Sequence, residues 1–259
     1  MNANTGRLEE ARTAFSEIYE KNLWRLGPGL ELEPDSVQRF VRLIQDFMRE
    51  NEVATVAEFG CGYWVYSKLI DWKGKRYDGY DVVESAIRYD TEQFSEENIH
   101  FHLVRDGIEL SGADLLICKD VFQHLPSEDI IYYIGKFKKI YKYMIITNDV
   151  FPDAHANGGI PSGGYRAIRL DREPFNERCA VLQTWEGVNF GERWTKHTCL
   201  LFGDPTAGGG ARTVLNNHPE FGPGASKTVQ RHSDNSLSRI MSRLPSLARF
   251  VRQIRAFLR

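Results

Sequence analysis

The chain has 259 residues, of which 42% are hydrophobic and 26% are charged, and its formal net charge at pH 7 is -2. This balance is ordinary for a globular protein and excludes a bulk electrostatic attraction to nucleic acid. No apolar stretch approaches the roughly 18 residues that a transmembrane helix needs. The length allows one large α/β domain, or a medium-sized domain with appendages.

The N-terminal sequence and the cysteines indicate the compartment of the protein. The first residues lack the basic-then-apolar pattern of a secretory signal. The four cysteines are widely spaced and form no CxxC pair. We therefore expect free thiols in a reducing, cytoplasmic compartment, without a disulfide framework or a metal site.

Two helical patterns open the chain. Residues 1–34 are expected to form a helical segment whose apolar side carries Phe15 and Tyr19. Residues 35–50 place apolar side chains on one stripe after a polar cap, which predicts an amphipathic helix. The main domain is expected to begin with this second helix and to cover residues 35–203.

Seven short segments rich in β-branched and other apolar residues predict strands. They are 54–59, 76–82, 99–104, 113–118, 142–147, 179–186 and 197–202. Helical patterns, such as the one at 127–141, separate the earlier segments, and this alternation favours right-handed crossovers and a parallel sheet. No helical pattern separates the last two segments, which predicts a terminal antiparallel hairpin. The expected fold is α/β: a Rossmann-like, seven-stranded, mostly parallel sheet with helices on both faces.

The C-terminal part of the chain has a different composition. Residues 204–236 are rich in Gly, Pro, Asn and Ser without periodicity, which predicts a flexible linker. Residues 237–259 carry six arginines and no acidic residue, with apolar residues at helical spacing. This pattern predicts a basic amphipathic helix that contacts an anionic membrane surface or a protein partner. The alternative is a helix that packs on its own domain or stays largely unstructured.

A glycine turn follows the first predicted strand. Gly60 and Gly62 would let the backbone turn sharply and approach a ligand without a Cβ in the way, although a purely structural turn is the alternative. A dinucleotide fingerprint requires a third small residue where this chain has Val65, which argues against NAD. Asp81 ends the second strand about twenty residues later, where a carboxylate can accept both ribose hydroxyls of a nucleoside or cap the next helix.

Polar residues also follow the third and fourth predicted strands. Asp106 could accept a hydrogen bond from an adenine amino group, or serve as a turn residue before a glycine. The run DLLICKDVFQHLP at 114–126 reads as a buried strand that delivers Asp120 and His124 to its C-terminal end. Open α/β sheets bind their ligands at this end of the strands.

Together, these segments resemble class I S-adenosylmethionine-dependent methyltransferases. The similarity rests on the GCG turn, on the aspartate that ends the second strand and on the DLLICKDVFQHLP run. It is closest to members with a Tyr…Trp segment near the N-terminus, here 19–24, and a later Gly-Gly-Tyr-Arg stretch, here 163–166. It covers roughly residues 15–203. Two departures are a shortened segment at 26–30 and the bulky pair 63–64, which replaces the family's acid-plus-glycine spacing after GCG.

The resemblance implies S-adenosyl-L-methionine as the cofactor, bound at the ends of the first strands. The residues that it implies to line or flank the cofactor are Glu58, Gly60, Cys61, Gly62, Asp81, Val82, Asp106 and Asp120. Tyr19 and Trp24 would fold over the cofactor as a lid, because aromatic faces attract a sulfonium. Ordinary packing of these two aromatic residues is the alternative.

The acceptor side is expected in the later part of the domain. His124 is the candidate general base, since the unperturbed pKa of histidine lies near neutrality. It could instead serve only in capping and packing, and a carboxylate or neutral amine acceptor would need no base. A long glycine-rich loop at 148–166 could frame the acceptor. The candidate residues are Asn148, Asp149, Tyr165 and Arg166, of which the arginine suits an anionic or hydroxyl-rich group.

The resulting hypothesis is a methyltransferase that acts on a small-molecule or glycan acceptor at oxygen. One alternative is a non-catalytic binding protein with the same fold, favoured by the bulky pair 63–64. Another is a nucleotide-dependent oxidoreductase, which the missing third glycine disfavours. Action on nucleic acid is disfavoured because the core lacks a basic stripe. We expect a cytoplasmic location, with peripheral contact at the inner membrane face if residues 237–259 bind lipid.

Overall fold

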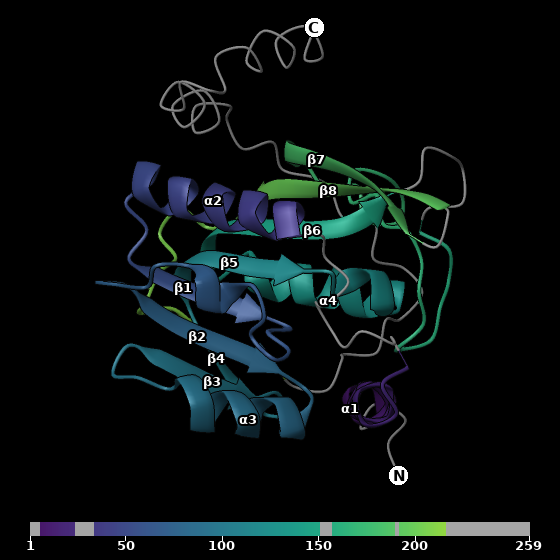
Figure 1. Ribbon diagram of the computed structural model, residues 1–259, viewed down its shortest axis with the longest axis horizontal. Helices are drawn as coiled ribbons and strands as arrows, with labels where there is room; N and C mark the ends of the chain where they lie inside the picture. The colour runs from purple at the N-terminus through teal and green to yellow at the C-terminus, as the bar shows by residue number, and fades with distance from the viewer. Residues whose placement is uncertain (1–5, 24–33, 151–156, 190–191, 216–259) are drawn as a thin grey trace, which may run out of the picture.

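The computed structural model describes residues 6–23, 34–150, 157–189 and 192–215. Its centre is a seven-stranded sheet in the order β3-β2-β1-β5-β6-β8-β7 (Figure 1). The strands are β1 (Thr55–Phe59), β2 (Arg76–Asp81), β3 (Ile99–Leu103), β5 (Ala113–Lys119), β6 (Tyr141–Val150), β7 (Ala180–Asn189) and β8 (Glu192–Phe202). β8 runs antiparallel to β6 and β7, and the other neighbouring strands are parallel. The predicted Rossmann-like fold with a terminal antiparallel hairpin is confirmed.

Helices cover both faces of this sheet. They are α1 (Gly6–Glu20), α2 (Pro34–Glu50), α3 (Glu84–Phe94) and α4 (Ser127–Phe137), with short 3-10 helices η1 (Ser67–Leu69) and η2 (Phe122–His124). The apolar stripe of α2, including Phe40 and Ile44, packs on one face against Tyr77 of β2. α4 packs on the opposite face, where Ile134 belongs to the same buried cluster as Phe59 of β1 (Figure 1). The side chains of the sheet therefore alternate between two separate apolar layers.

Two short strands were not predicted. β4 (Glu109–Ser111) and β9 (Arg212–Val214) form a separate antiparallel pair. β9 lies inside the segment whose composition predicts a flexible linker, and Ala207 and Leu215 in the same segment are buried. The domain therefore extends beyond the predicted boundary at 203, whereas the other predicted boundaries stay predictions. The remaining linker residues and the predicted basic helix at 237–259 lie outside the described residues, so their contacts stay predictions as well.

The carboxyl ends of the parallel strands meet at one edge of the sheet, and α1 lies beyond that edge (Figure 1). The loops that follow the five parallel strands, β1, β2, β3, β5 and β6, begin at this edge. None of the helices in the described part of the chain is long and apolar enough to cross a membrane. The arrangement places a candidate site between the sheet edge and α1.

Candidate active site

The glycine turn after β1 has a backbone that only glycine adopts without strain. The φ angles of Gly60 and Gly62 are 80° and 57°, in the left-handed region. The N–H of Gly60 donates to the Tyr80 carbonyl oxygen at 2.7 Å, which ties the turn to β2. A Cβ built on Gly60 would lie 2.3 Å from Cγ2 of Val121. The turn is therefore packed directly against the segment that follows β5.

Asp81, at the end of β2, is bonded to this turn. One carboxylate oxygen accepts from the N–H of Gly62 at 2.9 Å, and the other accepts from the N–H of Val83 at 2.9 Å. The bond to Val83 shows that Asp81 also orders the start of α3, whereas its ribose role stays a prediction. Burial raises the pKa of Asp81, and the backbone N–H groups oppose that rise. Each oxygen keeps a second lone pair that can accept from a ligand.

Trp64 lies away from the glycine turn, on the α2 side of the sheet. Its ring contacts Tyr77, Phe94 and Phe101 at centroid distances of 5.2–5.5 Å, and it is 4% exposed. Its φ angle of 53° is in the region that glycine prefers. The bulky indole is thus accommodated in an apolar layer and does not fill the space beside Asp81.

Helix α1 covers the turn and its neighbours from outside. The ring of Tyr19 contacts Tyr63 at 5.4 Å, and the ring of Phe15 contacts His124 at 6.5 Å. Burial, and after it the charge of Asp81, raises the pKa of Tyr19 well above its ordinary value. The lid role of Tyr19 stays a prediction, and Trp24 lies outside the described residues.

Glu58 differs from the other acidic residues implied to hold the cofactor. The alternation along β1 turns its side chain to the α2 side, where it is fully buried. It accepts hydrogen bonds from the hydroxyls of Tyr66 and Tyr77 and from Ser67 Oγ, the last at 2.6 Å. Burial raises the pKa of Glu58 to about 7, and the three hydroxyls limit the rise. Glu58 therefore links the end of β1 to the segment after the glycine turn and to β2 through these hydrogen bonds.

Three further residues of the implied cofactor set lie in different surroundings. Cys61 is buried beside the turn, and burial followed by the charge of Asp81 raises the pKa of its thiol. Val82 is half-buried and packs against the main apolar cluster. Asp106 is exposed in the turn after β3. Cys61 thus lies within the glycine turn and Val82 directly follows Asp81, whereas Asp106 is exposed to solvent.

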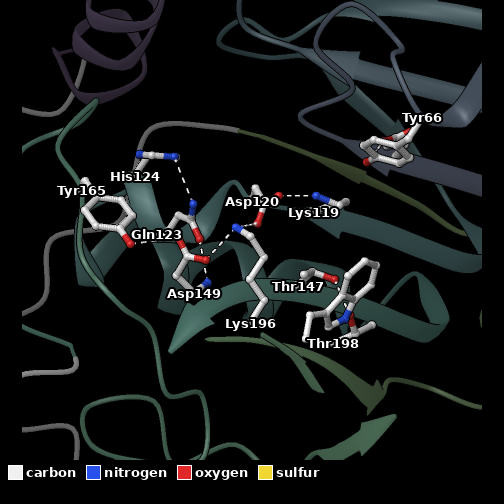
Figure 2. A network of polar contacts seen from close by, with 12 residues as sticks. Tyr66, Lys119, Asp120, Gln123, His124, Thr147, Asp149, Tyr165, Lys196 and Thr198 are labelled. Carbon is white, nitrogen blue, oxygen red and sulfur yellow. Dashed lines mark hydrogen bonds and ion pairs between the residues drawn. The ribbon is translucent and has the colours of Figure 1, made fainter. Parts of the chain in front are cut away.

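A chain of polar contacts runs from His124 to Lys119 across the ends of β5, β6 and β8 (Figure 2). In it, Lys196 Nζ lies 2.8 Å from Asp120 Oδ1 and 2.6 Å from Asp149 Oδ1, and Lys119 pairs with Asp120. Burial alone would raise the pKa of Asp120, but the two lysines hold it well below its usual range. Asp120 is therefore ionised and paired with two lysines, and its implied place beside the cofactor stays a prediction.

A backbone carbonyl next to this chain fixes the tautomer of His124. Its Nδ1 lies 2.8 Å from the carbonyl oxygen of Gly164, which can only accept, so Nδ1 carries the proton and Nε2 the lone pair. Gln123 accepts from the Asp149 N–H through Oε1 at 2.8 Å, and its Nε2 lies 3.4 Å from His124 Nε2. Burial lowers the pKa of His124 below 6.5, so the ring is neutral at neutral pH. A neutral, oriented imidazole is suited to accept a proton.

The predicted acceptor residues differ in their exposure and in their hydrogen-bond partners. Tyr165 is half exposed, and its hydroxyl donates to Asp149 Oδ2 at 2.9 Å. Arg166 is 6% exposed and donates through Nη2 to the Leu125 carbonyl at 2.8 Å. Its Nε and Nη1 are buried without a hydrogen-bond partner among the described residues, as is Oδ1 of Asn148. Burial lowers the pKa of Arg166, although the group stays a cation.

Three residues of the network were missed from the sequence: Lys119, Gln123 and Lys196. The first two stand inside the DLLICKDVFQHLP run, where their position next to Asp120 and His124 was the available signal. Lys196 reaches the site because the antiparallel register places it opposite Asp149, and that register is not readable from the sequence. No cluster of His, Cys, Asp or Glu suited to a metal ion occurs within the described ranges.

The sequence matches no protein-family model and no curated protein. Among solved structures, magnesium protoporphyrin IX methyltransferase from Synechocystis PCC 6803, with bound SAM, is 16% identical; the match covers 74% of this chain and 97% of that chain, with a TM-score of 0.50. The N-methyltransferase NodS from Bradyrhizobium japonicum WM9, with S-adenosylhomocysteine, is 15% identical over 76% of this chain and 98% of that chain, with a TM-score of 0.51. These similarities show that the chain has the class I methyltransferase fold.

Proposed function

We propose that this protein is an S-adenosylmethionine-dependent methyltransferase that transfers a methyl group to an oxygen of a small-molecule or glycan acceptor. The observation that carries the proposal is the bond between Asp81 and the N–H of Gly62, at the carboxyl edge of a sheet with the methyltransferase fold. It joins a glycine turn, which a backbone-contacting ligand needs, to a carboxylate that can accept from ribose.

The residues present fit the cofactor in charge and shape. Asp81 would accept from the ribose hydroxyls through its remaining lone pairs, while its negative charge favours a sulfonium nearby. Gly60 and Gly62 bring no side chain of their own to the turn, and their positive φ angles allow its sharp bend. Tyr19 and Tyr63 supply aromatic faces to a cation. The bound cofactor supplies the activated methyl group, so the protein mainly has to position the acceptor.

His124 is proposed to remove the proton of the acceptor hydroxyl as its oxygen attacks the methyl carbon. The carbonyl of Gly164 keeps the proton on Nδ1, so that Nε2 has the lone pair when the acceptor arrives. The proton that Nε2 receives makes an imidazolium, whose charge the Gly164 carbonyl and the carboxylates of Asp120 and Asp149 favour and Lys196 opposes. The polar chain in Figure 2 holds Gln123 and His124 in place for this step.

The acceptor is proposed to bear hydroxyl or anionic groups. Arg166 offers two buried N–H positions without partners among the described residues, and Asn148 offers a buried carbonyl oxygen in the same state. Buried polar groups of this kind are costly unless a partner satisfies them. A polar ligand that pairs with either residue would recover that cost.

A non-catalytic binding protein is the second candidate. It is favoured by the low exposure of Asp81, which is 7% exposed and so offers a ligand little access. Both candidates bind the cofactor, but only the methyltransferase forms S-adenosylhomocysteine when an acceptor is added.

Isothermal titration with S-adenosylmethionine, S-adenosylhomocysteine and NAD tests the proposal. We expect the wild type to bind the first two and not NAD. Asp81→Ala should weaken binding by about 1.5–3 kcal/mol, the scale of hydrogen bonds to a charged group. Asp71→Ala, an exposed aspartate in the loop before β2, is the control and should bind as the wild type does. No binding by the wild type, or equal binding by Asp81→Ala, would reject the assignment.

A further inference from the structure

Asp90, on α3, is a buried carboxylate that the proposed mechanism does not use. Its residue is 0% exposed, and neither oxygen has a hydrogen-bond partner in the part of the chain that the structure describes. An ionised carboxylate in such surroundings is strongly disfavoured unless a positive charge is nearby. The helix that carries it begins directly after Asp81, so the two acids belong to the same end of the sheet.

Ring contacts fix α3 against the segment that follows the glycine turn. Tyr89 contacts Tyr63 at 5.6 Å, and Phe94 contacts Trp64 at 5.2 Å. Asp90 lies between these two contacts, one helical turn from Phe94 and on the buried face of α3. Asp90 therefore belongs to the buried face of the helix that packs on the segment after the glycine turn.

The charged groups around Asp90 are mostly acidic. Burial, then Asp81 from β2 and Glu58 from β1, raise the pKa of Asp90 to about 8, and Lys68 from η1 opposes them. Asp90 is therefore neutral at neutral pH while no cation occupies the site. A positive charge bound nearby would reverse this balance and favour the carboxylate.

The charge of Asp90 affects the pKa values of two residues beside the glycine turn. Burial raises the pKa of the Tyr19 hydroxyl and of the Cys61 thiol, and the negative charges of Asp81 and, to a smaller extent, Asp90 raise both further. Tyr19 comes from α1 and Cys61 from the glycine turn itself, so the field of Asp90 reaches both sides of the space between them.

We infer that Asp90 distinguishes the positively charged methyl donor from its neutral product. The inference rests on the proposed function. When the sulfonium-bearing donor binds, the Asp90 carboxyl group loses its proton to solvent, and the new carboxylate attracts the donor. After methyl transfer the sulfur of the product is neutral, so Asp90 recovers a proton from solvent and the product loses that attraction.

Calorimetric titration in two buffers of different ionisation enthalpy, phosphate and Tris, tests this near neutral pH. We expect S-adenosylmethionine to release protons on binding to the wild type, and S-adenosylhomocysteine to release fewer. In Asp90→Asn the difference in proton release should vanish, and the preference for donor over product should fall about tenfold, the effect of one unit of pKa. Glu92→Gln, an exposed neutralisation on the same helix, is the matched control.

The outcomes separate the inference from the proposed function. If the wild type binds both ligands but releases protons equally with each, or if Asp90→Asn keeps the wild-type preference, the role of Asp90 is refuted while the methyltransferase proposal stands. If the wild type binds neither ligand, both fail. Equal proton release by the wild type with the two ligands would refute the role of Asp90 even if Asp90→Asn does not fold.

Discussion

Gly60 allows a direct test of why the turn after β1 needs glycine, because the cost of its backbone conformation can be separated from the cost of a steric contact. Alanine at this position meets a φ of 80°, a left-handed conformation that costs a non-glycine residue about 1–2 kcal/mol. The new Cβ would also lie 2.3 Å from Val121 Cγ2, and overpacking of this kind costs about 1–3 kcal/mol. We expect Gly60→Ala to lower the free energy of unfolding by the sum, about 2–5 kcal/mol.

Gly74 is the matched control for this substitution. Its φ is 69°, but a Cβ built there meets nothing within 4 Å. Gly74→Ala should therefore carry only the conformational cost of about 1–2 kcal/mol. Urea unfolding, followed by circular dichroism, gives both values by linear extrapolation.

A double-mutant cycle then isolates the contact with Val121. Val121→Ala removes the methyl group that a Cβ on Gly60 would strike, so Gly60→Ala should cost about 1–3 kcal/mol less in that background. Equal destabilisation by Gly60→Ala and Gly74→Ala, or an additive cycle, would refute the claim that the turn is packed against the segment after β5.

Two further substitutions examine the polar chain. The proposed base acts only when neutral, and burial lowers the pKa of His124 below 6.5; methyl transfer should therefore rise as pH increases through that lowered pKa and stay level at neutral pH. His124→Gln should lose this acid limb and reduce the rate by about 10²–10⁴, the usual contribution of a general base, whereas an unchanged pH profile would exclude the role. Lys196→Met removes the cation that Asp120 and Asp149 share, and should destabilise the fold by about 3 kcal/mol, the lower end for a broken buried pair. Thermal unfolding of Lys196→Met beside Lys196→Arg and the exposed-site control Lys139→Met measures this, and equal melting of all three would contradict it.

Much of the fold could be predicted because each strand has its own apolar signal and each early crossover its own helical pattern. The glycine turn and Asp81 were also accessible, since both occupy positions defined by the end of a strand. β4 and β9 escaped prediction because three residues of strand leave no periodicity, and β9 lies in a glycine-rich composition. Helix α4 ends at Phe137, earlier than its pattern suggests, because Tyr141 already begins β6.

The site was harder to predict where it depends on the direction of a side chain. Glu58 lies in the motif of the family, yet the two-residue alternation of β1 turns it to the α2 side and into bonds with three hydroxyls. The sequence around Asp120 includes Lys119 but does not indicate that Lys196, from β8, also pairs with it. The burial of Asp90 could not be predicted from the sequence. Its helix is amphipathic, and only the packing of α3 shows that the buried face includes an acid.

The pairing of Lys196 with Asp120 and Asp149 also has a consequence for the order of synthesis. Both aspartates leave the ribosome before the lysine that joins them, because Lys196 belongs to the last strand of the main sheet to be made. Until that strand adds to the edge of β6, a nascent domain would hold two neighbouring acids with only Lys119 to offset them. The addition of β8 to the sheet therefore also completes the polar chain during synthesis of the protein.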